Sequence, residues 1–161
     1  TDSEGLNALG LAYGSAERFQ DAIAAFRDVL ALDPTSALAN QNIATMLLQE
    51  TRATPATAAA KVREAEQFAR HAIDLDPALA KAFTTLGVIQ AQTNRKSEAI
   101  ESWKKAVSLN PGEFDALYNL VLLLVEGGRI GEARTFGDQY ISTAPPQLAA
   151  DAAVIRNILS R

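Results

Sequence analysis

Few side chains in this sequence could carry out acid–base or metal chemistry. There is no cysteine, and the one histidine is His71. Asp74 follows three residues later, so the two side chains would share one face of a helix. A protein metal site needs about three or four ligands, and this pair has no companion. We therefore interpret His71 as a surface residue and predict neither a metal site nor a catalytic histidine.

Phosphate and cofactor chemistry has equally little support. Gly127 and Gly128 precede a basic residue, Arg129, but the glycine–lysine pattern that holds nucleotide phosphates before a helix is missing. We predict no cofactor and no enzymatic activity for this segment. A longer parent chain could still carry a catalytic domain.

The composition is that of an ordinary globular protein, and it narrows the range of partners. Of the 161 residues, 48% are hydrophobic and 21% are charged. The net charge of −4 lacks the basic excess typical of nucleic-acid binding, so we expect no nucleic-acid partner. The longest apolar run, Leu120–Val125, is far shorter than the roughly 20 residues of a membrane helix, so we expect no membrane span.

The apolar spacing between Leu6 and Pro34 predicts two amphipathic helices. Residues three and four apart share a helix face. Two sets of residues with this spacing are apolar or small: Leu6, Leu9, Gly10 and Tyr13, and then Ala22, Ile23, Phe26, Val29 and Leu30. A polar connection at 15–18 has the length of a turn between antiparallel helices. Pro34 ends the second helix because it lacks an N–H group.

The same pattern recurs, and a proline closes each copy. Pro34, Pro77, Pro111 and Pro145 are separated by 43, 34 and 34 residues. The third copy keeps the apolar and small positions at Phe83, Leu86, Gly87, Ala99, Trp103 and Ala106. The fourth copy has Gly137 where an aromatic residue is expected, which predicts a close contact with the segment that follows.

This spacing resembles the tetratricopeptide repeat (TPR), a helix–turn–helix of about 34 residues. The first copy matches the family pattern at Leu9, Gly10, Tyr13, Ala22, Phe26 and Pro34, with Leu6 where the family prefers tryptophan. The resemblance covers about residues 3–147. It implies an all-α, right-handed superhelical solenoid of four helix–turn–helix repeats plus a C-terminal capping helix. We predict repeats at 3–36, 37–79, 80–113 and 114–147, and the capping helix at 147–161.

The second repeat carries an insertion near residues 50–58. We predict a first helix from Ser36 to about Gln49 and a second helix that Thr54 caps and Pro55 begins. The insertion is either a tolerated lengthening of a loop or a protrusion that contacts a neighbouring domain or subunit.

In TPR proteins the first helix of each hairpin lines a concave groove, and the resemblance implies the same here. The positions that remain after removal of the core form a mixed polar and apolar stripe. We take its groove candidates as Asn7, Leu11, Leu38, Gln41, Thr45, Leu48, Lys81, Thr84, Val88, Tyr118 and Leu122. The stripe also contains Glu4, Gly14, Ala91, Asp115 and Val125. Such a surface suits an extended peptide or a helix, held in apolar pockets and by hydrogen bonds to its backbone. Tyr118 is either an anchor for the partner or part of the packing under the C-terminal helix.

One TPR subclass binds a C-terminal carboxylate through Lys, Asn, Asn, Lys and Arg side chains. The equivalent positions here hold Asn7, Leu11, Asn42, Lys81 and Thr85, so Asn42 and Lys81 alone agree. Without the other cations a buried carboxylate would be poorly compensated. We therefore predict that this chain is not a clamp of that kind.

Three functional hypotheses follow. The leading one is a non-catalytic scaffold that binds a peptide or a partner protein in its groove. The second makes the segment the C-terminal regulatory or targeting part of a larger enzyme, since bacterial sulfatases and glycosyltransferases carry such arrays and Thr1 favours an excised piece. The third is a homodimerisation module that uses the end repeats or the insertion. No targeting peptide is visible, which leaves cytoplasm and periplasm open for a soluble chain.

Overall fold

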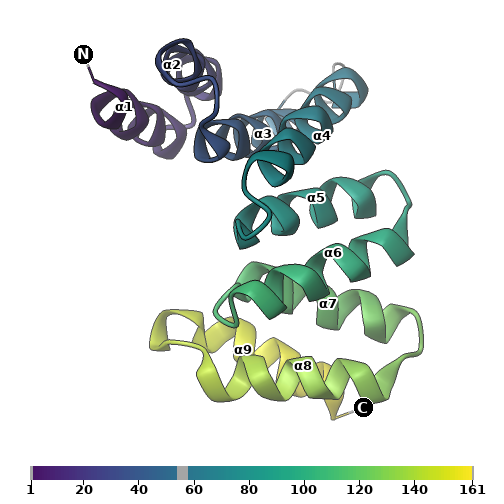
Figure 1. Cartoon of the computed structure of the whole chain (residues 1–161). Helices are drawn as coiled ribbons and strands as arrows, with labels where there is room; N and C mark the ends of the chain where they lie inside the picture. Colours follow the sequence, from purple (N-terminus) through teal and green to yellow (C-terminus); the bar gives the residue numbers. More distant parts are fainter. Residues whose placement is uncertain (1, 54–57, 161) are drawn as a thin grey trace.

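Helices make up almost all of the computed structural model, which describes residues 2–53 and 58–160 (Figure 1). In this part of the chain they are α1 (Ser3–Ser15), α2 (Phe19–Leu32), α3 (Ala37–Ala53), α4 (Ala58–Leu75), α5 (Ala80–Gln92), α6 (Lys96–Leu109), α7 (Phe114–Glu126), α8 (Ile130–Thr143) and α9 (Ala149–Leu159). A short 3-10 turn, Pro146–Leu148, leads into α9. None of the described helices is long and apolar enough to cross a membrane.

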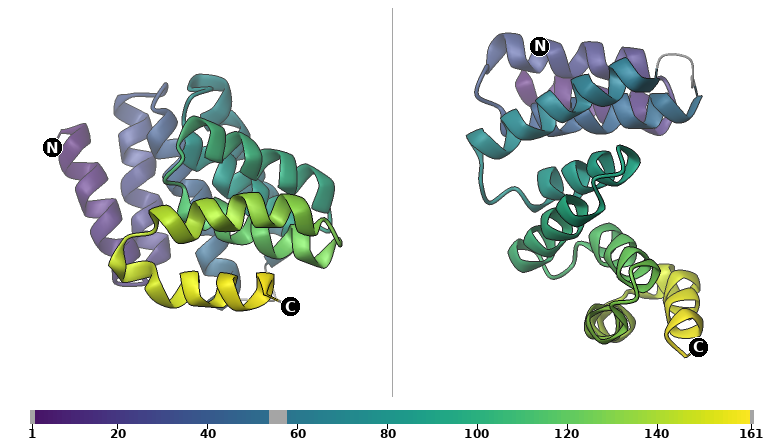
Figure 2. Two further views of the ribbon diagram at one scale, coloured as in Figure 1. Left: turned by 90° about the horizontal axis from the view of Figure 1, so that it is seen from below. Right: turned by 90° about the vertical axis from the view of Figure 1, so that its right-hand side faces the viewer.

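The helices pack as consecutive pairs. α1 packs against α2, α3 against α4, α5 against α6, and α7 against α8. Each pair then packs on the next, and α9 covers α8 and part of α7. Figure 2 shows the pairs stacked in chain order, with the two termini at opposite ends of the array. The predicted all-α architecture of four helical repeats followed by a C-terminal helix is confirmed.

The same turn joins the two helices of three pairs. Its last residue donates a backbone hydrogen bond to a carbonyl five residues earlier: Arg18 to Tyr13 at 2.9 Å, Arg95 to Gln90 at 2.8 Å, and Arg129 to Leu124 at 2.8 Å. The preceding residue has a positive φ in each case, at Glu17 (57°), Asn94 (60°) and Gly128 (71°). This geometry ends a helix in a left-handed residue and satisfies its last carbonyl groups.

Side-chain caps begin two of the first helices. Asp2 caps α1, and its Oδ1 accepts a hydrogen bond of 2.7 Å from the Gly5 N–H. Ser3 is the first helical residue. Ser36 caps α3, because its hydroxyl accepts a hydrogen bond of 3.3 Å from the Ala39 N–H.

Two predicted helix ends lie elsewhere in the structure. α3 continues to Ala53 rather than ending near Gln49, so the first helix of the second repeat takes up part of the insertion. The predicted cap Thr54 and helix start Pro55 lie outside the described residues. The C-terminal α-helix begins at Ala149, because Pro146–Leu148 forms a 3-10 turn first.

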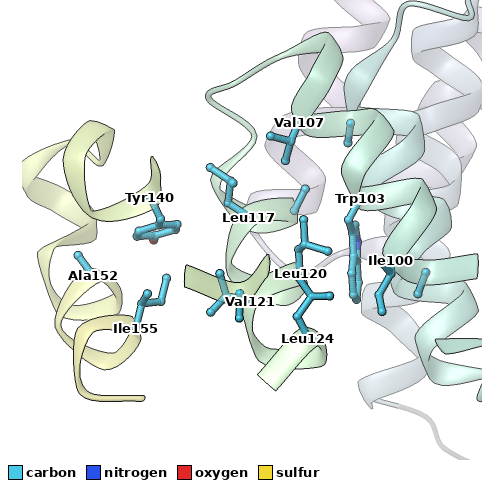
Figure 3. Close-up of a cluster of buried hydrophobic side chains, with 14 residues drawn as sticks. Ile100, Trp103, Val107, Leu117, Leu120, Val121, Leu124, Tyr140, Ala152 and Ile155 are labelled. Carbon is cyan, nitrogen blue, oxygen red and sulfur yellow. The ribbon is translucent and has the colours of Figure 1, made fainter. Parts of the chain in front are cut away.

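Buried apolar side chains form two main clusters along the array. The N-terminal core joins α2 to α5 and consists of Ala22, Ile23, Phe26, Ile43, Ala44, Met46, Leu47, Leu48, Val62, Ala65, Ala69, Leu86 and Ile89. The C-terminal core joins α6 to α9 and consists of Ala99, Ile100, Trp103, Ala106, Val107, Ala116, Leu117, Leu120, Val121, Leu124, Ala133, Tyr140, Ala152 and Ile155. Figure 3 shows the α7 side chains of the C-terminal core between Trp103 of α6 on one side and Tyr140 and Ile155 on the other.

Glycines let large side chains lie directly on a helix backbone. A Cβ atom on Gly10 would lie 2.6 Å from the Phe26 ring, and one on Gly87 would overlap the Trp103 indole. Gly137 is covered in the same way by Leu159 of α9. The predicted close contact at Gly137 is therefore present, and its partner is the C-terminal helix.

Candidate functional site

A cavity of about 370 Å³ opens along the first helices of repeats two to four. We call it the groove cavity. Its walls come from α3, α5 and α7, together with one residue each of α8 and α9. It is lined by Thr45, Leu48, Gln49, Arg52, Lys81, Thr84, Thr85, Val88, Phe114, Asp115, Tyr118, Asn119, Tyr140 and Asp151.

Aromatic rings form one side of the groove cavity. Phe114 and Tyr140 meet edge to face, with ring centroids 5.4 Å apart and an interplanar angle of 79°. Tyr118 lies 6.3 Å from Tyr140 in a tilted arrangement. Tyr140 is 1% exposed and belongs to the C-terminal core, whereas Tyr118 is only half-buried. The fixed Tyr140 ring thus supports the more accessible Tyr118, which a ligand could cover.

Several polar groups of the groove cavity already have partners within the chain. Thr45 accepts a hydrogen bond of 2.8 Å from the Gln41 amide, and its hydroxyl lies 3.4 Å from that of Thr85. The Thr84 hydroxyl donates to the Glu113 carboxylate at 3.0 Å. The Thr45–Thr85 contact links α3 to α5, and the Thr84–Glu113 bond links α5 to the residue before α7.

The charged residues of the groove cavity behave differently. In residues 2–53 and 58–160, no ion pair involves Arg52, Lys81, Asp115 or Asp151. Burial raises the pKa of the Tyr140 hydroxyl, and the nearby negative charges of Asp151 and Asp115 raise it further. Tyr140 is therefore a neutral phenol beside two carboxylates at neutral pH.

Six of the eleven predicted groove residues line this cavity: Thr45, Leu48, Lys81, Thr84, Val88 and Tyr118. They come from repeats two to four. Leu48 and Thr84 are 7% and 6% exposed, so they present little surface to a ligand. Tyr118 packs against Tyr140 of α8 and also lines the cavity, and its role as an anchor for a partner stays a prediction.

The other five candidates lie elsewhere. Gln41 is 2% exposed and serves as an internal hydrogen-bond donor. Leu11 and Leu38 are exposed near the N-terminal end of the array, and Leu122 is half-buried on α7. Asn7 is half-buried, and its Oδ1 is the one buried side-chain oxygen or nitrogen without a hydrogen-bond partner in the described part of the chain.

The structure also adds residues that the stripe of first helices did not contain. Gln49, Arg52, Phe114, Asn119, Tyr140 and Asp151 were absent from it, whereas Asp115 was part of the stripe and Thr85 was noted as a clamp position. Tyr140 and Asp151 come from α8 and α9, which the stripe excludes by definition. Arg52 belongs to the extra turn of α3 that the predicted helix end had removed.

The groove cavity combines an aromatic surface with charged residues. His71 is exposed on α4 and is not among the lining residues. Within the described residues, no group of three or more His, Cys, Asp or Glu side chains could hold a metal ion. An aromatic surface with charges at its edges can instead bury an apolar side chain and pair with its neighbours.

Comparison with known proteins supports a repeat fold. Models of the tetratricopeptide repeat family match residues 3–36 and residues 84–149. The peroxisomal targeting signal receptors of Komagataella phaffii and Komagataella pastoris are each 29% identical over 93 residues, which is 58% of this chain. The match spans only 16% of the length of these receptors.

Solved structures share the fold at low sequence identity. A thermophilic TPR protein of Thermus thermophilus superimposes with a TM-score of 0.85 at 18% identity, over 100% of this chain and 83% of the other. MamA gives 0.70 at 24% identity, over 88% and 77%. The first TPR domain of Spaghetti, bound to the HSP90 peptide SRMEEVD, gives 0.66 at 19% identity, over 78% and 93%.

These likenesses agree with the hairpins read from the sequence and with the paired helices of the structure. The two family matches lie in the first repeat and in the third and fourth repeats. The solved structures extend the shared fold over the whole chain. The chain is a tetratricopeptide repeat protein.

Proposed function

We propose that this segment is a non-catalytic interaction module and that it binds a peptide or a segment of a partner protein in the groove cavity. The observation that carries the proposal is the half-buried ring of Tyr118, held by Tyr140 and open to a cavity of about 370 Å³. An aromatic side chain that a partner can cover is the usual source of binding energy at an interface.

The solved relatives support the class of ligand. The first TPR domain of Spaghetti is bound to an HSP90 peptide, and the second TPR domain of human RPAP3 is in complex with an HSP70 peptide. Both share the fold of this chain at 19% and 23% identity, with TM-scores of 0.66 and 0.61. A peptide is therefore a reasonable probe, although the charges of this cavity differ from those of a carboxylate clamp.

The test is selection of peptides from a random phage-displayed library on the immobilised chain, followed by affinity measurement with variants. Tyr118→Ala should weaken the selected peptides about 30-fold or more, as expected for loss of an interface anchor. Tyr118→Phe should retain most of the affinity, because the ring that the ligand covers remains.

Tyr13→Ala is the matched control. Tyr13 is also half-buried, but it lies in the first repeat and does not line the groove cavity. The selected peptides should bind this variant as they bind the wild type. Circular dichroism and thermal melting must show that both alanine variants stay folded. Equal binding by Tyr118→Ala and the wild type would place the interaction elsewhere and overturn the proposal.

A further inference from the structure

A second hollow adjoins the groove cavity on the side of the first repeat. It has a volume of about 490 Å³ and is lined by Gly14, Ser15, Glu17, Phe19, Gln49 and Arg52. We call it the first-repeat pocket. Gln49 and Arg52 also line the groove cavity, so the two hollows meet along the C-terminal part of α3.

The wall of the first-repeat pocket is built where α1 ends and α2 begins. A Cβ atom on Gly14 would lie 2.8 Å from the sulfur of Met46, so the end of α1 lies close against α3. The Arg18 N–H donates a hydrogen bond of 2.9 Å to the Tyr13 carbonyl oxygen and closes the turn. Phe19 follows as the first residue of α2, and this turn therefore sets its position at the pocket.

Phe19 and Tyr118 have similar surroundings at opposite sides of this surface. Each ring is half-buried, packs against a buried apolar cluster and lines a hollow: Phe19 the first-repeat pocket on the N-terminal core, Tyr118 the groove cavity on the C-terminal core. Between the two hollows lie the exposed side chains of Gln49 and Arg52, which can donate hydrogen bonds to the carbonyl groups of a peptide.

We propose that the first-repeat pocket is a second subsite of the groove and takes an apolar side chain of the same ligand. The ligand is an extended segment with two apolar side chains, one that covers Tyr118 and one that covers Phe19. Its backbone crosses α3 at Gln49 and Arg52. This inference rests on the proposed function and adds the length and the apolar spacing of the ligand to it.

The packing of the first helices sets the spacing of the two apolar side chains. Because α5 packs on both α3 and α7, it lies between them. The axes of packed helices are about 8–10 Å apart, so the path from α7 to α3 covers about 20 Å before it reaches the first-repeat pocket. An extended chain advances about 3.3 Å per residue, which places the two apolar side chains about six or more residues apart.

A second subsite raises affinity at little additional cost. Once one side chain covers Tyr118, the ligand has already lost most of its translational and rotational freedom, and the second side chain binds within the same complex. Burial of one more large apolar side chain should then strengthen binding about tenfold or more.

The experiment selects peptides of about 15 residues from a random library on the whole chain and then applies a double-mutant cycle. Selected peptides should carry two apolar residues about six or more positions apart. Alanine in place of the apolar residue that is not coupled to Tyr118 should weaken binding to the wild type about tenfold. The same peptide change should have little effect on binding to Phe19→Ala, because the contact that it removes is already missing there.

Phe68→Ala is the matched control for Phe19→Ala. Phe68 of α4 is also half-buried against the N-terminal core, but it lines neither hollow. Its replacement should change the affinity of the two-anchor peptide by no more than about twofold.

Ser15→Trp tests the pocket without opening the core. Ser15 is exposed, and an indole at this position would occupy the space that the second apolar side chain needs. This variant should weaken the two-anchor peptide about tenfold, whereas a shortened peptide that reaches Tyr118 alone should bind it as it binds the wild type.

The outcomes separate this inference from the proposed function. Selected peptides that depend on Tyr118 but have a single apolar anchor, or that bind Ser15→Trp as tightly as the wild type, overturn the inference and leave the groove cavity as the binding site. Equal losses for Phe19→Ala and Phe68→Ala do the same, since they would reflect the shared core. Selection that yields no Tyr118-dependent peptide overturns both.

Discussion

The two ends of the array differ in how far the apolar side chains of their helices are buried. At the N-terminal end, Leu9 and Leu11 of α1 are 42% and 53% exposed. At the C-terminal end, Val121 of α7 and Tyr140 of α8 are 0% and 1% exposed. The difference is a neighbour, because α9 packs over α8 and α7 (Figures 1 and 3). In a solenoid each repeat buries its apolar face only where the next element covers it, so burial depends on position in the array as well as on sequence.

The glycine contacts show the same dependence inside the array. Gly10 and Gly87 occupy equivalent positions, and each is covered by an aromatic ring of its own hairpin, Phe26 and Trp103. In the last repeat the corresponding large side chain is missing, and Leu159 of α9 covers Gly137 instead. The first and third repeats are thus packed by their own hairpin, whereas the last repeat needs a helix from outside it.

Removal of the C-terminal helix should cause the largest loss of stability. Cutting the chain after Pro146 removes Ile155 and exposes Tyr140 and Val121, which are otherwise buried in the C-terminal core. We expect a loss of several kcal/mol in the free energy of unfolding, on the order of the burial of two or three large apolar side chains. Chemical denaturation measures the loss, and size-exclusion chromatography detects aggregation of the exposed face.

The matched truncation removes α1 up to Ser15. It should also lower the free energy of unfolding, because α1 contributes the buried Leu6 and Gly10 and covers the Phe26 ring, which is 0% exposed. A C-terminal truncation that melts like the full chain and remains monodisperse would contradict the importance of α9 as a cover.

Adding a methyl group to an internal glycine should cause the next largest loss of stability. Gly87→Ala forces the Cβ atom into the Trp103 indole, which is 3% exposed and donates a hydrogen bond of 3.1 Å to the Thr84 carbonyl oxygen. We expect a net loss of about 1–3 kcal/mol, the usual cost of overpacking. Thermal or urea unfolding measures it.

Gly137→Ala is the comparison at the end of the array. Its Cβ atom would first meet a terminal methyl group of Leu159, which can rotate away, and α9 can shift because it is the last element. The better helix propensity of alanine, about 1 kcal/mol, should offset most of the remaining cost. A larger loss for Gly137→Ala than for Gly87→Ala would show that α9 is held as rigidly as an internal helix.

The shared turn allows a smaller test. Glu17 and Gly128 adopt φ values of 57° and 71° at equivalent points of the first and last hairpins. Left-handed conformations are unfavourable for most side chains, so Glu17→Gly should stabilise the protein by about 0.5–1 kcal/mol and Gly128→Ala should destabilise it by a similar amount. Opposite shifts of the melting temperature are the expected result. Shifts of the same sign would mean that side-chain contacts, rather than φ, decide the choice of residue.

Several of these features were readable from the sequence. The helix pairs, their order and the close approach at Gly137 follow from spacings of three and four residues and from the terminating prolines. Such signals are local, since they depend on a few turns of one helix and its cap. The end of α3 was misplaced because the insertion reads as a loop, yet its helix continues through Arg52 to Ala53.

The sequence identified only some of the residues that line the groove cavity, and the reason is physical. The sequence alone determined which residues lie on the outer stripe of each first helix, and Thr45, Lys81, Val88 and Tyr118 were found in this way. Only the tertiary structure decided that the stripe of the first repeat does not reach the cavity, that Gln41 is buried, and that Tyr140 and Asp151 join it. A helical period specifies directions around one axis, whereas the residues that share a cavity depend on the angles and distances between axes. Those are set by the packing of all the repeats together.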